Sequence, residues 1–189
     1  MSIPEKENKY TFADYLMWDE GERVELIDGK VINMSPAPSR KHQQILREFS
    51  TEFSLFLRGK DCEVFFAPFD VRLFSASKRD DEITDVVQPD LSIVCNPEIL
   101  DDKGCNGAPD MIIEILSPSS VKLDRWDKYM LYEKAGVKEY WIADPINESV
   151  EVYLKEGEQF KLYGVYTKNE IVSVSTLVDF EIDLNQIFI

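Results

Sequence analysis

The chain has 189 residues, of which 44% are hydrophobic and 12% aromatic, so it can bury a core and fits one domain. Its 36 acids against 21 bases give a net charge of −15, a field that repels nucleic acid. No apolar run approaches the ~20 residues of a membrane span. The single histidine, His42, excludes multi-histidine zinc sites.

The chain begins with patterns for a short helix and a β-hairpin. Residues 10–20 have helical character, and Thr11 can cap their first turn. Residues 23–34 contain two apolar strands around Asp28-Gly29, a sequence that strongly favours a tight hairpin turn. The prolines in residues 35–38 end this part of the chain.

A helix and two strands follow. Residues 39–58 have apolar side chains at helical spacing between a capping Ser39 and Gly59, with His42 at the edge of the apolar stripe. Residues 62–74 indicate a strand with a bend at Pro68, and residues 86–95 indicate a second strand. Polar loops are expected at residues 75–85 and 96–108.

Glu114 lies in the apolar run of residues 109–116, which predicts a buried strand. Met111, Ile113 and Ile115 should point to one face, and Ile112, Glu114 and Leu116 to the other. A helix is expected over residues 121–135, closed by Gly136, then a strand over 138–144 and an all-β segment from 146 onward.

These patterns predict a mixed α/β fold, with one domain over residues 1–189. Residues 1–38 form a helix and hairpin, residues 39–145 an αβββαβ core, and residues 146–189 a β-extension. The alternating C-terminal strands offer edges for a second copy, which favours a homodimer. The N-terminus lacks the apolar core of a secretory signal, and the three cysteines form no Cys-x-x-Cys pair. We therefore expect reduced thiols in a cytoplasmic protein that does not enter a membrane.

Two carboxylates on consecutive strands could carry chemistry. Asp90 and Glu114 each lie among apolar residues, and a buried carboxylate costs several kcal/mol unless it is paired. With a main-chain carbonyl they would suit Mg²⁺ or Mn²⁺, which prefer oxygen ligands. A structural salt bridge with Lys128 or Arg125 explains the same residues, and spacing alone leaves both interpretations open.

The ordered motifs resemble a known family. They are Gln-Pro-Asp90, the run from Pro109 to Ser119 that contains Glu114, Asp124-x-x-x-Lys128-x-x-x-Tyr132, and the run from Gly136 to Pro145. Together with Val-Glu25-Leu-Ile-Asp-Gly29, Met34-Ser-Pro36 and His42, they resemble the Uma-two family, a branch of the restriction-endonuclease-like PD-(D/E)XK superfamily.

The resemblance implies a restriction-endonuclease-like core and a metal-dependent nuclease. In that superfamily an Asp and a Glu bind the metal, so Asp90 and Glu114 are the expected ligands, with the Ile115 carbonyl as a third. The superfamily lysine that activates water stands two residues after the Glu, where this chain has Leu116. The resemblance to the Uma-two family implies that this lysine instead lies on the next helix, which here points to Lys128 as a catalytic residue.

Three further residues are auxiliary candidates under this resemblance. Glu25 is either a second acid at the site or a surface carboxylate of the hairpin. His42 either contacts the site or a phosphate, or is a histidine satisfied at a helix start. Asp124 orients Lys128 or caps its helix. Tyr132, Tyr140 and Trp141 are expected in the core.

Our hypothesis is an endonuclease that uses Mg²⁺ or Mn²⁺ to hydrolyse phosphodiesters, with DNA as the substrate by family analogy. The alternative is a non-catalytic interaction protein that keeps the fold, which the charge of −15 and the displaced lysine favour. A glycosidase-like use of the two carboxylates gives Lys128 no role.

Overall fold

The computed structural model describes residues 9–18, 23–34 and 38–189. The end of the expected first helix, residues 19 and 20, and the expected chain break at 35–37 lie outside the described residues. The central sheet has six strands in the order β12-β11-β10-β9-β6-β3. Their bounds are β3 Glu63–Phe66, β6 Leu91–Val94, β9 Met111–Ile115, β10 Glu139–Asp144, β11 Ser149–Glu156 and β12 Gln159–Thr167. Only β9 and β10 of these pair in parallel; the other neighbours are antiparallel.

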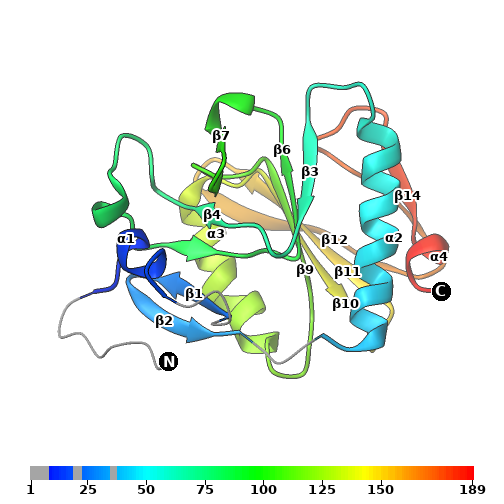
Figure 1. Cartoon of the computed structure of the whole chain (residues 1–189). Helices are drawn as coiled ribbons and strands as arrows, with labels where there is room; N and C mark the ends of the chain where they lie inside the picture. The colour runs from blue at the N-terminus through cyan, green and yellow to red at the C-terminus, as the bar shows by residue number, and fades with distance from the viewer. Residues whose placement is uncertain (1–8, 19–22, 35–37) are drawn as a thin grey trace.

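The expected alternation of β9 is confirmed. Met111, Ile113 and Ile115 belong to the core under helix α2 (Arg40–Leu57), whereas Ile112 and Leu116 belong to the core under α3 (Tyr129–Ala135). Figure 1 shows α2 on one side of the sheet and α3 on the other. Glu114 therefore points to the α3 face, because successive side chains of a strand alternate.

A second six-stranded sheet, in the order β2-β1-β5-β4-β8-β7, packs on the α3 side. Its strands are β1 Val24–Ile27, β2 Lys30–Asn33, β4 Val71–Arg72, β5 Val86–Val87, β7 Leu100–Asp101 and β8 Gly104–Cys105. The predicted hairpin is confirmed, with positive φ angles at Asp28 (51°) and Gly29 (69°). Helix α1 (Phe12–Tyr15) is capped by Thr11, as expected.

Two expected strands are each divided between the two sheets. Residues 62–74 give β3 and β4, separated at Pro68, and residues 86–95 give β5 and β6, separated at Pro89. Proline has no N–H to donate to a ladder, so the chain leaves one sheet at each proline and joins the other. The expected loops contain the 3₁₀ turns η1 (Asp80–Glu82) and η2 (Pro97–Ile99), and the second also contains β7 and β8.

Both long helices lie where they were predicted. Ser39 caps α2 by accepting a hydrogen bond from the His42 N–H at 3.2 Å. The second helix contains a π-helical segment, η3 (Leu123–Lys128), before α3, and ends at Gly136 with φ 95°. The C-terminal segment is not all-β: β13 (Ile171–Ser173) and β14 (Glu181–Asp183) are followed by α4 (Leu184–Ile187). These elements pack against α2 (Figure 1).

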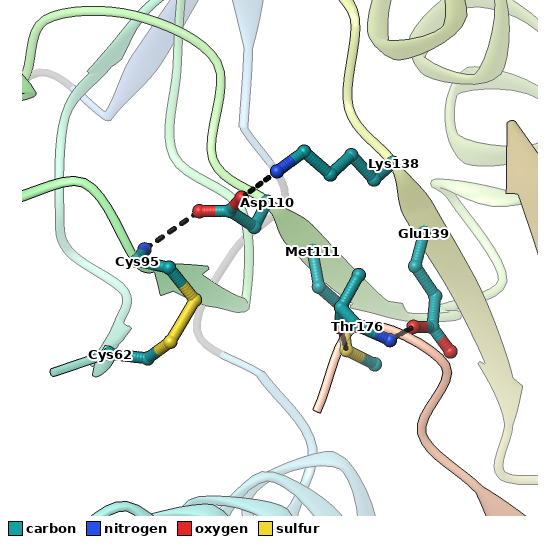
Figure 2. Close-up of a disulfide and its surroundings, with 7 residues drawn as sticks. All are labelled: Cys62, Cys95, Asp110, Met111, Lys138, Glu139 and Thr176. Carbon is teal, nitrogen blue, oxygen red and sulfur yellow. Dashed lines mark hydrogen bonds and ion pairs between the residues drawn. A yellow bond between two sulfur atoms is a disulfide. The ribbon is translucent and has the colours of Figure 1, made fainter. Parts of the chain in front are cut away.

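The expectation of three reduced thiols is wrong for two cysteines. Cys62 and Cys95 form a disulfide, and Cys105 is free and buried. Cys62 precedes β3 and Cys95 follows β6, and the register pairs Glu63 with Val94, so the two cysteines face each other across the strands. Figure 2 shows Asp110 beside this bond, accepting from the Cys95 N–H (2.7 Å) and from Lys138 (2.6 Å).

None of the helices formed by the described residues is long and apolar enough to cross a membrane. The expected homodimer stays a prediction, and β12 is the strand that forms one edge of the central sheet.

Candidate functional site

The register of two central strands brings Asp90 and Glu114 together. Leu91 of β6 pairs with Ile113 of β9 in antiparallel fashion, so the next position along sets Asp90 opposite Glu114. The Ile115 N–H donates to Asp90 Oδ2 at 2.8 Å, and the Asp90 N–H lies 3.4 Å from Glu114 Oε2. The structure therefore brings the two carboxylate residues side by side.

Lys128 reaches the same place from the helix that follows β9. Its Nζ lies 2.9 Å from Glu114 Oε1, 2.9 Å from Glu25 Oε1 and 4.0 Å from Asp124 Oδ1. All four side chains are buried, so the ammonium group neutralises charge in a site that water hardly reaches. Arg125, the other cation considered from sequence, instead pairs with Asp144 and Glu151.

The π-helical segment η3 explains how one helix presents three polar groups to this site. Asp124, Lys128 and Tyr132 are spaced four apart, and a step of four residues overshoots an α-helical turn by about 40°. The wider π turn makes the same step fall short of a full turn. The four-residue step from Asp124 to Lys128 lies within η3, and the step from Lys128 to Tyr132 lies within α3. The rotation about the helix axis therefore falls short of a full turn in the first step and exceeds it in the second, so the three side chains stay on one face.

Two residues at the site were not assigned to it from sequence. The Tyr132 hydroxyl donates to Glu114 Oε1 at 2.7 Å, and the Gln88 N–H donates to Glu25 Oε1 at 2.8 Å. Tyr132 is fully buried, as expected of a core residue, but its hydroxyl holds the carboxylate. The four-residue spacing with Lys128 was the signal that could have placed it here. Glu25 is a buried member of the site rather than a surface carboxylate.

His42 contacts Asp90 from the first turn of α2. Its Nε2 lies 3.1 Å from Asp90 Oδ2, while its Nδ1 is buried without a hydrogen-bond partner among the described residues. Burial disfavours the charged ring, but the hydrogen bond to Asp90 and the negative charges of Asp90 and Asp124 raise the pKa of His42 above its ordinary value. The histidine therefore lies at the site and is not only a residue of the helix start.

The electrostatics of the cluster follow from burial. Burial raises the pKa of Glu114 well above its ordinary value, against the opposing effect of Lys128. Burial likewise raises the pKa of Asp124 to about 6. For Lys128, burial favours the neutral amine, but the carboxylates of Glu114, Glu25 and Asp124 outweigh it and hold its pKa high. Strongly shifted groups that share one cavity are typical of functional sites.

A cavity of about 540 Å³ opens above these groups. Five carboxylates line it (Glu25, Asp90, Glu114, Asp124 and Asp144) against three cations, Arg23, Lys41 and Lys128. Among residues 9–18, 23–34 and 38–189, no three His, Cys, Asp or Glu side chains are grouped so that they could hold a metal ion by themselves. A metal here would need oxygen donors beyond side chains.

The chain is similar to known proteins in sequence and in fold. Residues 12–185 match the family model Uma2, described as "Putative restriction endonuclease". An uncharacterized protein of Synechocystis is 25% identical over 180 residues, covering 93% of this chain and 90% of its own length. The crystal structure of a protein from Anabaena variabilis, titled a putative nuclease belonging to DUF820, superimposes with a TM-score of 0.73. It has 22% identity and the match covers 94% of this chain and 97% of that one.

Proposed function

Because the chain belongs to the Uma2 family of restriction-endonuclease-like proteins, we propose that it is a divalent-metal-dependent phosphodiesterase that cleaves nucleic acid. The observation that carries this proposal is the meeting of Asp90, Glu114 and Lys128 at the floor of one cavity. In the superfamily that this chain resembles, phosphodiester hydrolysis needs two acidic residues and one lysine. Asp90, Glu114 and Lys128 are residues of these types.

The donor set fits a hard cation. The proposed ligands are the carboxylates of Asp90 and Glu114 and the main-chain carbonyl of Ile115, all oxygen donors of the kind that Mg²⁺ and Mn²⁺ prefer. Among the described residues, none donates a hydrogen bond to Asp90 Oδ1, and the one donated to Glu114 Oε2 is the long bond of 3.4 Å from the Asp90 N–H. A cation would also offset the excess of carboxylates in the cavity. When bound, it supplies Lewis-acid activation of water and of the phosphate.

The chain's own residues position the reacting groups. The Ile115 N–H and His42 hold Asp90 Oδ2, which leaves Oδ1 directed elsewhere. Tyr132 and Lys128 hold Glu114 Oε1. The Lys128 ammonium group can donate to an oxygen of the phosphate or of the attacking water, and its positive charge stabilises the negative charge that develops there.

The second candidate is an interaction protein without catalysis. Lys128 already pairs with Glu25 and Glu114, so part of the buried negative charge is compensated without a metal, and the net charge of −15 opposes the binding of nucleic acid. Calorimetric titration with Mn²⁺ separates the two candidates. We expect binding that Asp90→Asn abolishes; no binding at millimolar Mn²⁺ would favour the interaction protein.

The direct test is cleavage of nucleic acid with Mn²⁺ by wild type, Asp90→Asn, Glu114→Gln and Lys128→Met. Glu158→Gln is a matched control, because Glu158 is an exposed acid in the turn between β11 and β12. We expect cleavage by wild type and by the control, and loss in the three site variants. Equal activity in all five proteins would show that the cleavage does not come from this site.

A further inference from the structure

The cavity limits which nucleic acid can reach the candidate catalytic groups. Glu25, Glu114, Asp124 and Lys128 are each at most 4% exposed. A scissile phosphate must therefore enter the cavity to meet them and cannot be cleaved while it lies on the outer surface. The volume of about 540 Å³ is within the range of small-molecule sites, roughly 300–1,000 Å³.

The charges at the cavity do not match a duplex. Of the described residues that line it, the cations that solvent can reach are Arg23, which is exposed, and Lys41, which is half-buried. Arg23 has no ion pair with a described residue, and Lys41 Nζ lies 3.2 Å from Glu148 in a partly exposed pair that a phosphate can displace at little cost. A protein that makes about 6–10 phosphate contacts to duplex DNA neutralises about as many charges with Lys and Arg, whereas the two cations at the cavity suit one or two phosphates.

The walls of the cavity are apolar enough to receive a base. Met34, Pro38, Val121, Pro145 and Ile146 line it, and Val121 and Ile146 are exposed to solvent. These side chains can pack on the face of any base, so they give contact without reading sequence. A base can offer its face to these side chains only when it is unstacked from its neighbours, which an intact duplex does not allow.

We propose that the substrate is a single strand: one nucleotide enters the cavity, its base lies on the apolar wall, and its flanking phosphates contact Arg23 and Lys41. This inference rests on the proposed function and specifies its substrate class. DNA and RNA share the chemistry that these contacts recognise. The buried floor and the small number of exposed cations both exclude an intact duplex from the position of attack.

The experiment compares three 20-nucleotide substrates of one sequence with Mn²⁺: single-stranded DNA, single-stranded RNA and duplex DNA. We expect at least one single strand to be hydrolysed ten-fold or more faster than the duplex. Raising salt from 50 to 200 mM should weaken its binding only about seven-fold, as two phosphate contacts on a single strand predict. Arg23→Gln and Lys41→Gln should each weaken that binding and flatten the salt dependence.

Lys138→Gln is the matched control, since Lys138 is an exposed lysine paired with Asp110 and does not line the cavity. It should leave binding unchanged. Duplex cleavage as fast as single-strand cleavage, lost in Glu114→Gln, would overturn the single-strand inference and keep the proposed function. Hydrolysis of none of the three substrates would contradict the proposed function and the inference with it. An equal loss of binding in Lys138→Gln would overturn the role of Arg23 and Lys41.

Discussion

The ammonium group of Lys128 lies 2.9 Å from Oε1 of Glu114, with both side chains buried. This ion pair explains how a carboxylate can be buried in an apolar strand, because the ammonium group lies close enough to compensate its charge. It also places the ammonium group of Lys128 beside a proposed metal ligand, where both a structural and a chemical role are open to test.

Lys128→Met should destabilise the fold by about 3–5 kcal/mol, because it leaves Glu114 and Glu25 buried without their cation. Urea unfolding at pH 7 measures the free energy. Lys138→Met is the control: Lys138 pairs with Asp110 at 2.6 Å but is 68% exposed, so its loss should cost below about 1 kcal/mol. Equal costs for the two variants would mean that the buried cluster does not depend on Lys128.

Tyr132→Phe should weaken Mn²⁺ binding by about ten-fold or more, because the hydroxyl orients Glu114 through its 2.7 Å hydrogen bond and such supporting contacts typically contribute 10–100-fold in metal affinity. Calorimetric titration measures the affinity. Tyr153→Phe removes a hydroxyl that donates to Glu151, away from the cluster, and should leave the affinity unchanged. If Tyr132→Phe binds Mn²⁺ as wild type does, Tyr132 is only a core residue.

Stability should depend on the ionisation of Asp124. Burial raises the pKa of Asp124 from 3.8 to about 6, so the folded state holds its proton more tightly than the unfolded state. Its contribution to stability is present at low pH and is lost as pH rises through about 6. The free energy of unfolding of wild type minus that of Asp124→Asn should therefore fall by about 1 kcal/mol between pH 5 and 7.

Asp127→Asn provides the comparison for this titration, because Asp127 lies on the same helix but is exposed. Its difference from wild type should stay nearly constant over the same pH range. A difference for Asp124→Asn that is constant or rises with pH would contradict the raised pKa.

The Cys62–Cys95 disulfide predicts a simple labelling pattern. In denaturant without reductant, alkylation followed by mass spectrometry should modify one cysteine, Cys105, and after reduction all three. The Cys62→Ala, Cys95→Ala double variant should lose about 2–4 kcal/mol of stability. Three labelled cysteines in the unreduced protein would contradict the disulfide.

Much of the fold follows from local patterns in the sequence. The alternation of residues 111–116 assigns Glu114 to one face of a buried strand, and the Asp28-Gly29 turn and the Ser39 cap mark the hairpin and α2. The local structure of these segments depends on residues that are close in sequence, so sequence patterns predict it well.

Contacts that depend on the register of the sheets are harder to predict from the sequence. Cys62 and Cys95 meet only because β3 and β6 pair with Glu63 opposite Val94, and a separation of 33 residues gives no sign of that. Glu25 reaches Lys128 only because the second sheet packs against the α3 side of the first. The sequence predicts that Tyr132 lies in the core, and burial alone does not show where its hydroxyl points.

The most direct test of the proposed metal site is the rate at which Glu114→Gln cleaves a single-stranded oligonucleotide with Mn²⁺, relative to wild type and to Glu158→Gln. If Glu114 and Asp90 hold the metal at this cavity, wild type and Glu158→Gln cleave at similar rates and Glu114→Gln loses activity while remaining folded. Cleavage by Glu114→Gln at the wild-type rate would contradict the assignment of the site.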